Sequence, residues 1–128
     1  MVENGLKRGL NAPKGLDPAG RELWASTQRH LRAQDTWQDA DAPLLESYVR
    51  AVCLSRTARE AAAEEPFVEG SKGQLVAHPG LRVAAEAERD ACRYATALLL
   101  TPEARKRHDV HAPEGADDLI PFLTTVAA

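Results

Sequence analysis

A long helical pattern between Asp41 and Pro66 is the feature that most constrains how this chain can fold. Apolar residues recur at helical spacing from Leu44 to Leu54, continue through a run of alanines to Glu65, and stop at the proline. A helix of roughly 24 residues would span about 36 Å. A domain built from 128 residues cannot bury such a helix along its whole length, so the pattern suggests a partner.

The composition points the same way. Apolar residues make up 44% of the chain, but much of that fraction is alanine, and aromatic residues make up only 5%. Alanine buries little area, so an alanine-rich core gains less free energy per residue than one built from leucine or phenylalanine. Part of the stability is therefore expected to come from neighbouring subunits.

Local signals place two further helices, one before and one after this long helix. Asp17-Pro18 supplies an N-cap oxygen followed by proline at the first helical position, which predicts a helix over residues 18–33. Residues 34–40 are polar apart from Trp37 and read as a short connection. The third helix is expected to begin near Pro79 or Gly80 and to close at the leucines of residues 98–100.

Two shorter elements complete the pattern. Residues 67–79 contain two β-prone pieces around a Gly-Ser-Lys-Gly centre, which predicts a small hairpin or an ordered loop. Thr101-Pro102-Glu103 predicts the start of a short fourth helix over residues 102–108. The expected fold is mainly α, with three main helices, a short fourth helix, and the small β-hairpin or ordered loop between the second and third.

The chain carries no recognisable catalytic or metal-binding set. Cys53 and Cys92 lie within apolar helical patterns and read as small buried hydrophobes, while His108 and His111 lack the further ligands of a zinc site. No apolar run approaches the roughly 20 residues of a membrane helix, and we expect a cytoplasmic protein. We expect no cofactor, no metal and no enzymatic activity.

Charge gives weak candidates for nucleic-acid contact. The formal net charge is −3, so overall basicity does not indicate DNA binding. Basic residues nevertheless gather in the first 14 residues, along the first predicted helix and in the fourth, and phosphate binding needs several such charges on one surface. The candidates are Lys7, Arg8, Lys14, Arg29, Arg32, Arg105, Lys106 and Arg107. Each of them could instead be a solvated residue of a helix face.

The apolar faces of the second and third predicted helices are the candidates for subunit contacts. Their interface residues are expected to be Leu44, Leu45, Tyr48, Val52, Leu81, Ala85 and Leu98. For Tyr48, as for Trp24 and Trp37, packing in the core or between subunits is favoured over base stacking.

Four motifs in order resemble the small terminase subunits of tailed phages, of the cos-packaging type. Residues 16–24 are similar to the family's "L-x-x-x-G-x-x-x-W" opening, and residues 41–48 to the start of its second helix. Residues 73–79 resemble its "G-x-x-x-x-H-P" junction, and residues 99–105 its "L-x-L-T-P-x-A-R" ending. The resemblance covers roughly residues 15–107, and the stretch after His108 has no counterpart.

The resemblance implies a non-catalytic protein that recognises double-stranded viral DNA and forms a homo-oligomer, often a ring. It would recruit or regulate the large subunit, which holds the ATPase and the nuclease, in the cytoplasm of the infected bacterial host. On this interpretation residues 1–16 form a flexible basic arm, residues 17–109 a helical core for oligomerisation and DNA recognition, and residues 110–128 an acidic tail. The tail is a candidate contact for the large subunit through Leu119, Ile120 and Phe122.

Two alternatives remain open. A helical oligomeric regulator or scaffold that does not contact DNA directly would fit the negative net charge. A small hydrolase would need a serine or cysteine clustered with a histidine in a pocket.

Overall fold

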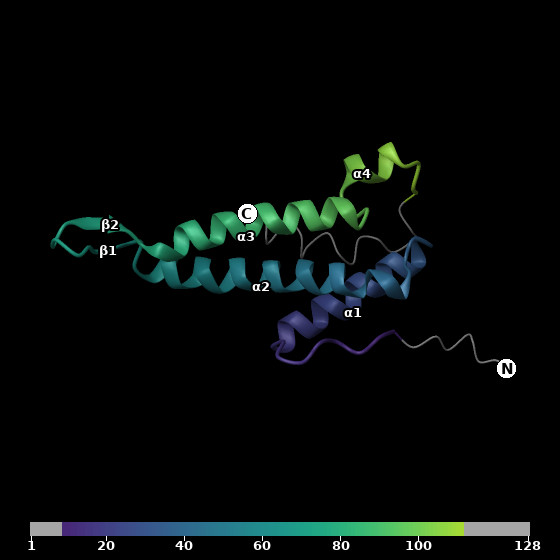
Figure 1. Ribbon diagram of the computed structural model, residues 1–128, viewed down its shortest axis with the longest axis horizontal. Helices are drawn as coiled ribbons and strands as arrows, with labels where there is room; N and C mark the ends of the chain where they lie inside the picture. The colour runs from purple at the N-terminus through teal and green to yellow at the C-terminus, as the bar shows by residue number, and fades with distance from the viewer. Residues whose placement is uncertain (1–8, 112–128) are drawn as a thin grey trace.

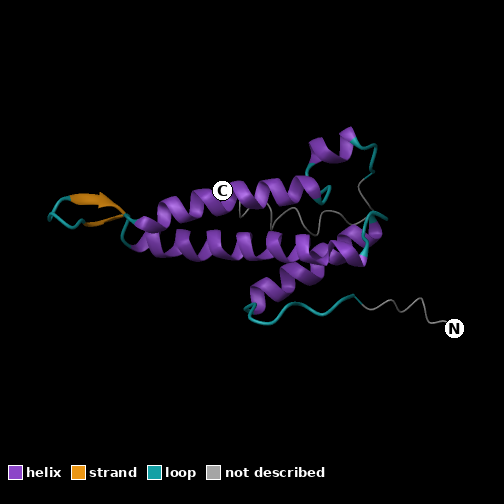
Figure 2. Ribbon diagram, viewed as in Figure 1, coloured by secondary structure: helices purple, strands orange, loops and turns teal. Residues whose placement is uncertain are grey.

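The computed structural model describes residues 9–111 of the chain. The elements follow one another as α1 (Pro18–Ala33), the 3₁₀ turn η2 (Asp39–Asp41), α2 (Ala42–Glu64), β1 (Phe67–Glu69), β2 (Leu75–Ala77), α3 (Pro79–Ala97) and α4 (Pro102–Arg107). Helices make up nearly all of the regular structure, and the two strands form a separate tip (Figure 2). The mainly α fold with a small hairpin is confirmed. The turn η2 was not anticipated within the predicted connection.

The long helix finds its main partner inside the chain. α3 runs back antiparallel along α2, so that the two form a helical hairpin (Figure 1). Every buried residue of α3 is small: Gly80, Ala84, Ala87, Ala91 and Ala95. Because small residues let two helix backbones approach closely, this alanine-rich face packs tightly against α2.

Gly80 shows how close that approach is. A Cβ atom added to Gly80 would lie 2.8 Å from the backbone carbonyl oxygen of Ala58 in α2, which is closer than such atoms normally come. Position 80, at the start of α3, therefore has no room for a side chain. The same turn is capped by His78, whose Nδ1 accepts a 2.8 Å hydrogen bond from the Gly80 N–H, so the predicted junction motif is a helix start.

α1 crosses beneath the hairpin and carries much of the large-residue core. Asp17 caps it as predicted, accepting a 2.7 Å hydrogen bond from the Gly20 N–H. Leu23, Trp24 and Leu31 are buried together with Leu45 and Val49 of α2. A helix with one apolar stripe buries that stripe against its neighbour.

Part of the predicted N-terminal arm lies on this core. The Trp24 indole N–H donates a 2.9 Å hydrogen bond to the carbonyl oxygen of Leu10, and Leu16 is buried. The Arg50 guanidinium also donates to the Lys14 carbonyl oxygen at 3.2 Å. Residues 10–16 therefore pack against α1 and α2, while the domain limits at residues 16 and 109 stay predictions.

The β-hairpin stands at the far end of α2 and α3 (Figure 1). Its register pairs Phe67 with Ala77, Val68 with Val76 and Glu69 with Leu75. The turn requires Gly73, whose φ of +76° favours glycine. The sequence left a hairpin and an ordered loop open, and the structure contains the hairpin.

α4 closes the opposite end of the molecule. Thr101 caps it as predicted, accepting a 3.2 Å hydrogen bond from the Ala104 N–H. The preceding helix, α3, ends at Ala97. Leu99 follows with a φ of +64°, and the Leu100 N–H then bonds the Ala95 carbonyl oxygen at 2.9 Å. This left-handed helix ending turns the chain so that α4 lies across the end of α3.

Candidate nucleic-acid interface

Two basic segments that are distant in sequence lie at the same end of the molecule. The buried Gln34, just after α1, donates a hydrogen bond from Nε2 to the carbonyl oxygen of Leu99, 65 residues further along the chain, at 3.2 Å. This contact ties the C-terminal end of α1 to the turn before α4, away from the β-hairpin (Figure 1). We call the last turn of α1 together with α4 the basic end.

The three basic side chains of α4 that the sequence predicts to contact DNA have different surroundings. Arg105 is half-buried and donates a 2.7 Å hydrogen bond to the Leu100 carbonyl oxygen. Arg107 is exposed and pairs with Glu103 one helical turn earlier, at 2.6 Å. Lys106 is exposed between them, while the buried Ala104 anchors the helix. Arg105 therefore stabilises the turn, and Lys106 and Arg107 face solvent.

The two predicted DNA-binding arginines of α1 lie near its C-terminal end. Arg29 is exposed and lies 3.8 Å from Glu22, whereas Arg32 is largely covered and lies 4.0 Å from Asp39 of η2. Residues three positions apart lie about 60° apart around a helix axis, so Arg29 and Arg32 lie on one side of α1. His30 points in another direction.

His30 of α1 lies close enough to Arg105 of α4 to feel its positive charge. Burial lowers the pKa of this histidine, a hydrogen bond with Gln34 opposes that shift, and the positive charge of Arg105 lowers the pKa further. A neutral imidazole therefore lies beside Arg105 at neutral pH. The sequence did not single out His30 or Gln34, because a histidine and a glutamine near a helix end carry no local sign of a contact with a distant turn.

The other DNA-binding candidates are not part of the basic end. Lys14 precedes α1 and lies beside Arg50 in the middle of α2. Lys7 and Arg8 lie outside the described residues, as does the acidic tail with Leu119, Ile120 and Phe122.

The predicted subunit-contact residues divide into two groups. Four of them are buried inside the single chain: Leu45, Tyr48, Val52 and Leu98. Burial also raises the pKa of Tyr48 to about 12, as expected for a phenol in an apolar core. Packing within the chain accounts for these four side chains. The other three are only partly covered and remain candidates: Leu44, Leu81 and Ala85.

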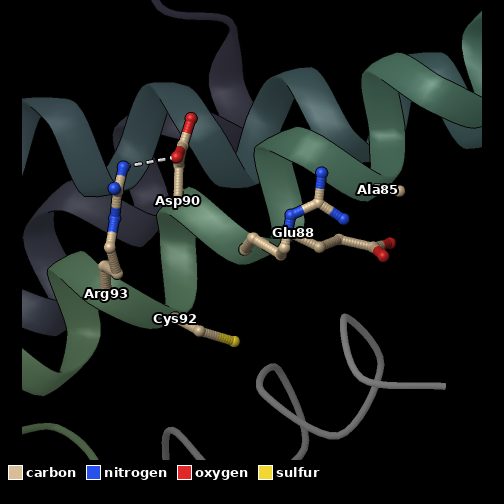
Figure 3. A pocket seen from close by; sticks show the side chains of 6 residues that line it. Ala85, Glu88, Asp90, Cys92 and Arg93 are labelled. Atoms are coloured by element: carbon tan, nitrogen blue, oxygen red, sulfur yellow. Dashed lines mark hydrogen bonds and ion pairs between the residues drawn. The ribbon is translucent and has the colours of Figure 1, made fainter.

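An open depression of about 630 Å³ lies on the outer face of α3 (Figure 3). It is lined by Ala85, Glu88, Arg89, Asp90, Cys92 and Arg93, all from this helix. Asp90 and Arg93 form an ion pair, and the exposed Cys92 extends away from it. Arg59 of α2 binds the Glu88 carboxylate through two 2.8 Å hydrogen bonds, which lower the pKa of Glu88. These residues do not form the nucleophile–histidine cluster that a hydrolase requires.

The described part of the chain contains neither a cluster of metal ligands nor a membrane-spanning helix. Within residues 9–111, no three acidic, cysteine or histidine side chains are grouped so that they could hold a metal ion. Within the same residues, no helix combines the length and the apolar character needed to cross a membrane.

Comparison with known proteins gives one finding. A family model described as phage terminase, small subunit, matches residues 20–115. The matched span begins in the first turn of α1, includes α2, both strands and α3, and extends past α4. No curated protein and no solved structure matches the chain.

Proposed function

Because the chain belongs to the phage terminase small-subunit family, we propose that it binds double-stranded viral DNA, assembles as a homo-oligomer and serves the large terminase subunit. The family assigns the chain a role in phage genome packaging.

The basic end is the proposed DNA contact. The DNA contact is proposed because the Gln34–Leu99 hydrogen bond brings α4 and the last turn of α1 together at one end of the molecule. Lys106 and Arg107 are exposed there, and Arg29 extends the positive surface around α1. Arginine can bind a phosphate through two parallel hydrogen bonds, so the ion pairs of Arg29 and Arg107 with nearby carboxylates can exchange for phosphates. Lys7, Arg8 and Lys14 would then add charge from the N-terminal segment.

Assembly is proposed through the surfaces of the α2–α3 hairpin that the chain leaves uncovered. Leu44, Leu81 and Ala85 are partly exposed along it, and Leu54 is 50% exposed. A ring of copies would let several basic ends engage one DNA molecule, which raises the apparent affinity without any new kind of contact.

Recruitment of the large subunit is assigned to the acidic C-terminal segment on the basis of its sequence alone.

DNA binding is tested by measuring affinity for duplex DNA as a function of salt concentration. Lys106→Ala should weaken binding and should reduce the slope of log K against log [salt] by about 1, because one phosphate contact is lost. Lys72→Ala is the matched control. It removes another exposed lysine from the β-hairpin, at the other end of the molecule, and should leave both quantities unchanged.

Three results would contradict the DNA part of the proposal. Binding that is undetectable at low salt would favour the scaffold that does not contact DNA directly. Equal losses in Lys106→Ala and Lys72→Ala would place the contact elsewhere. Binding by Lys106→Ala that equals wild type would remove α4 from the interface.

Assembly is tested separately by light scattering at micromolar protein concentration. A single mass that is a multiple of the 13.9 kDa chain is expected. A monomer over the whole concentration range would contradict the oligomer, whatever the DNA measurement shows.

A further inference from the structure

The β-hairpin carries an apolar face that the chain does not cover. Antiparallel partners lie on the same face of a strand pair, so the register places Phe67, Glu69, Leu75 and Ala77 together. Phe67 is 58% exposed and Leu75 is 73% exposed. An isolated two-stranded hairpin is marginally stable in water, so this face would gain stability from a partner surface.

A second apolar feature lies in the middle of the molecule. An open depression of about 340 Å³ is lined by Gly15, Leu16, Asp17, Arg50, Cys53 and Leu54. It lies where the segment before α1 meets the outer side of α2. A cavity of about 150 Å³ is enough to hold a benzene ring, so this depression has room for the Phe67 or Leu75 side chain.

The hairpin cannot reach the depression of its own chain. From Leu54 to the end of α2 at Glu64 the helix rises about 15 Å, and the strands lie beyond that end (Figure 1). The two features therefore point to contact between different copies.

The charges around the two features are complementary. The hairpin and its stem hold Glu64, Glu65 and Glu69 against a single lysine, Lys72. Around the depression, Arg21 and Arg50 donate hydrogen bonds to the carbonyl oxygens of Leu16 and Lys14. These two arginines and Lys14 are three cations, against the two carboxylates of Asp17 and Glu46, the second of which pairs with Arg50 at 2.7 Å. An acidic apolar tip would thus meet a basic apolar depression, and such complementarity favours the correct pairing of copies.

We propose that the β-hairpin of one copy inserts Phe67 and Leu75 into the depression around Leu16, Cys53 and Leu54 of the next copy. The contact joins two different surfaces, so it is head-to-tail and generates a ring if the rotation between copies closes. An aromatic side chain in a pocket is the usual anchor of such an interface. This inference rests on the oligomeric part of the proposed function and names its contact.

The first test removes the apolar tip. The double variant Phe67→Ser, Leu75→Ser should convert the oligomer to monomers by light scattering and keep the helical circular dichroism signal, since both side chains are exposed. Val83→Ser is the matched control, because Val83 is 39% exposed on α3 and lies outside both features. An oligomer that persists in the double variant, or one that is lost equally in Val83→Ser, would overturn the contact.

The second test detects the contact directly by cross-linking in a background with Cys53→Ser and Cys92→Ser. With a short bis-maleimide reagent, the variant carrying both Leu54→Cys and Leu75→Cys should give covalent dimers and higher species. Each single-cysteine variant should give none. Equal products from Leu75→Cys alone would indicate contact between two hairpins and would overturn the proposal.

The outcomes separate this inference from the proposed function. If wild type is an oligomer and the double-cysteine variant gives no cross-link, this contact is wrong and oligomerisation stands. If wild type is a monomer, both the oligomer and the contact are wrong.

Discussion

Gly80→Ala tests the close packing on which the helical hairpin depends. The added methyl group would lie 2.8 Å from the Ala58 carbonyl oxygen, whereas ordinary contact begins at 3.4 Å. To lengthen this contact from 2.8 Å to 3.4 Å, α2 and α3 must separate by about 0.6 Å at this point. Neither helix can yield easily, because the obstacle is backbone that is hydrogen-bonded within α2.

The expected cost follows from two opposing effects. Forcing an extra methyl group into a well-packed contact costs about 1–3 kcal/mol. Alanine is a better helix former than glycine by up to about 1 kcal/mol, and less in the first turn. The free energy of unfolding should therefore fall by about 1–2 kcal/mol.

Gly70→Ala is the matched control. A Cβ atom at Gly70 would also lie 2.8 Å from its nearest neighbour, but that neighbour is the Gln74 side-chain amide. A flexible side chain can move aside, so this substitution should change stability by less than about 0.5 kcal/mol. Urea unfolding followed by circular dichroism at 222 nm measures both variants. Two protein concentrations are needed, since assembly adds to apparent stability.

The reasoning would be refuted if Gly80→Ala were as stable as wild type, or if it lost no more stability than Gly70→Ala. Either result would mean that the helices separate at little cost, and that the small residues of α3 do not fix the distance between α2 and α3.

Three further predictions concern helix ends and pH. Asp17→Ala removes the side-chain cap of α1 and should lower the free energy of unfolding by about 1 kcal/mol, measured by urea unfolding; an unchanged midpoint would contradict the capping role. Asp35→Gly should raise it by about 0.5–1 kcal/mol, because Asp35 has a φ of +62° and places a negative charge after the C-terminal end of α1; a lower melting temperature would contradict this. Burial lowers the pKa of His30, so the unfolded chain takes up a proton first and stability should fall as the pH drops below about 6.5. His30→Gln should lose part of that decline between pH 7.5 and 5.5, and an identical decline in the variant would exclude His30 as its source.

Local chemistry made the helix boundaries predictable. Asp17 and Thr101 cap their helices through contacts with residues three positions away, and Pro66 ends the second helix because it has no N–H to donate. The predicted limits of 18 and 33 for α1 agree with the structure. Such signals depend only on neighbouring residues, so one sequence contains them.

The candidate site was predictable only in part. The basic cluster of residues 105–107 could be read from the sequence, but its position beside the end of α1 depends on a hydrogen bond between Gln34 and Leu99. Neither local sequence indicates that pairing. A sequence does not distinguish a polar side chain that bonds a distant carbonyl oxygen from one that bonds water.

Neighbouring residues are enough to indicate which segments are helical, where they start and stop, and that a small turn-rich segment separates the two long helices. How these segments share their apolar surfaces depends on the packing of the folded chain. The apolar face of α2 suggested a neighbouring subunit, yet α1 and α3 of the same chain bury Leu45, Tyr48 and Val52. Among the large apolar side chains that stay exposed in residues 9–111 are Leu54, Phe67 and Leu75. Periodicity shows that a face is apolar, but the identity of its partner depends on contacts between distant parts of the chain.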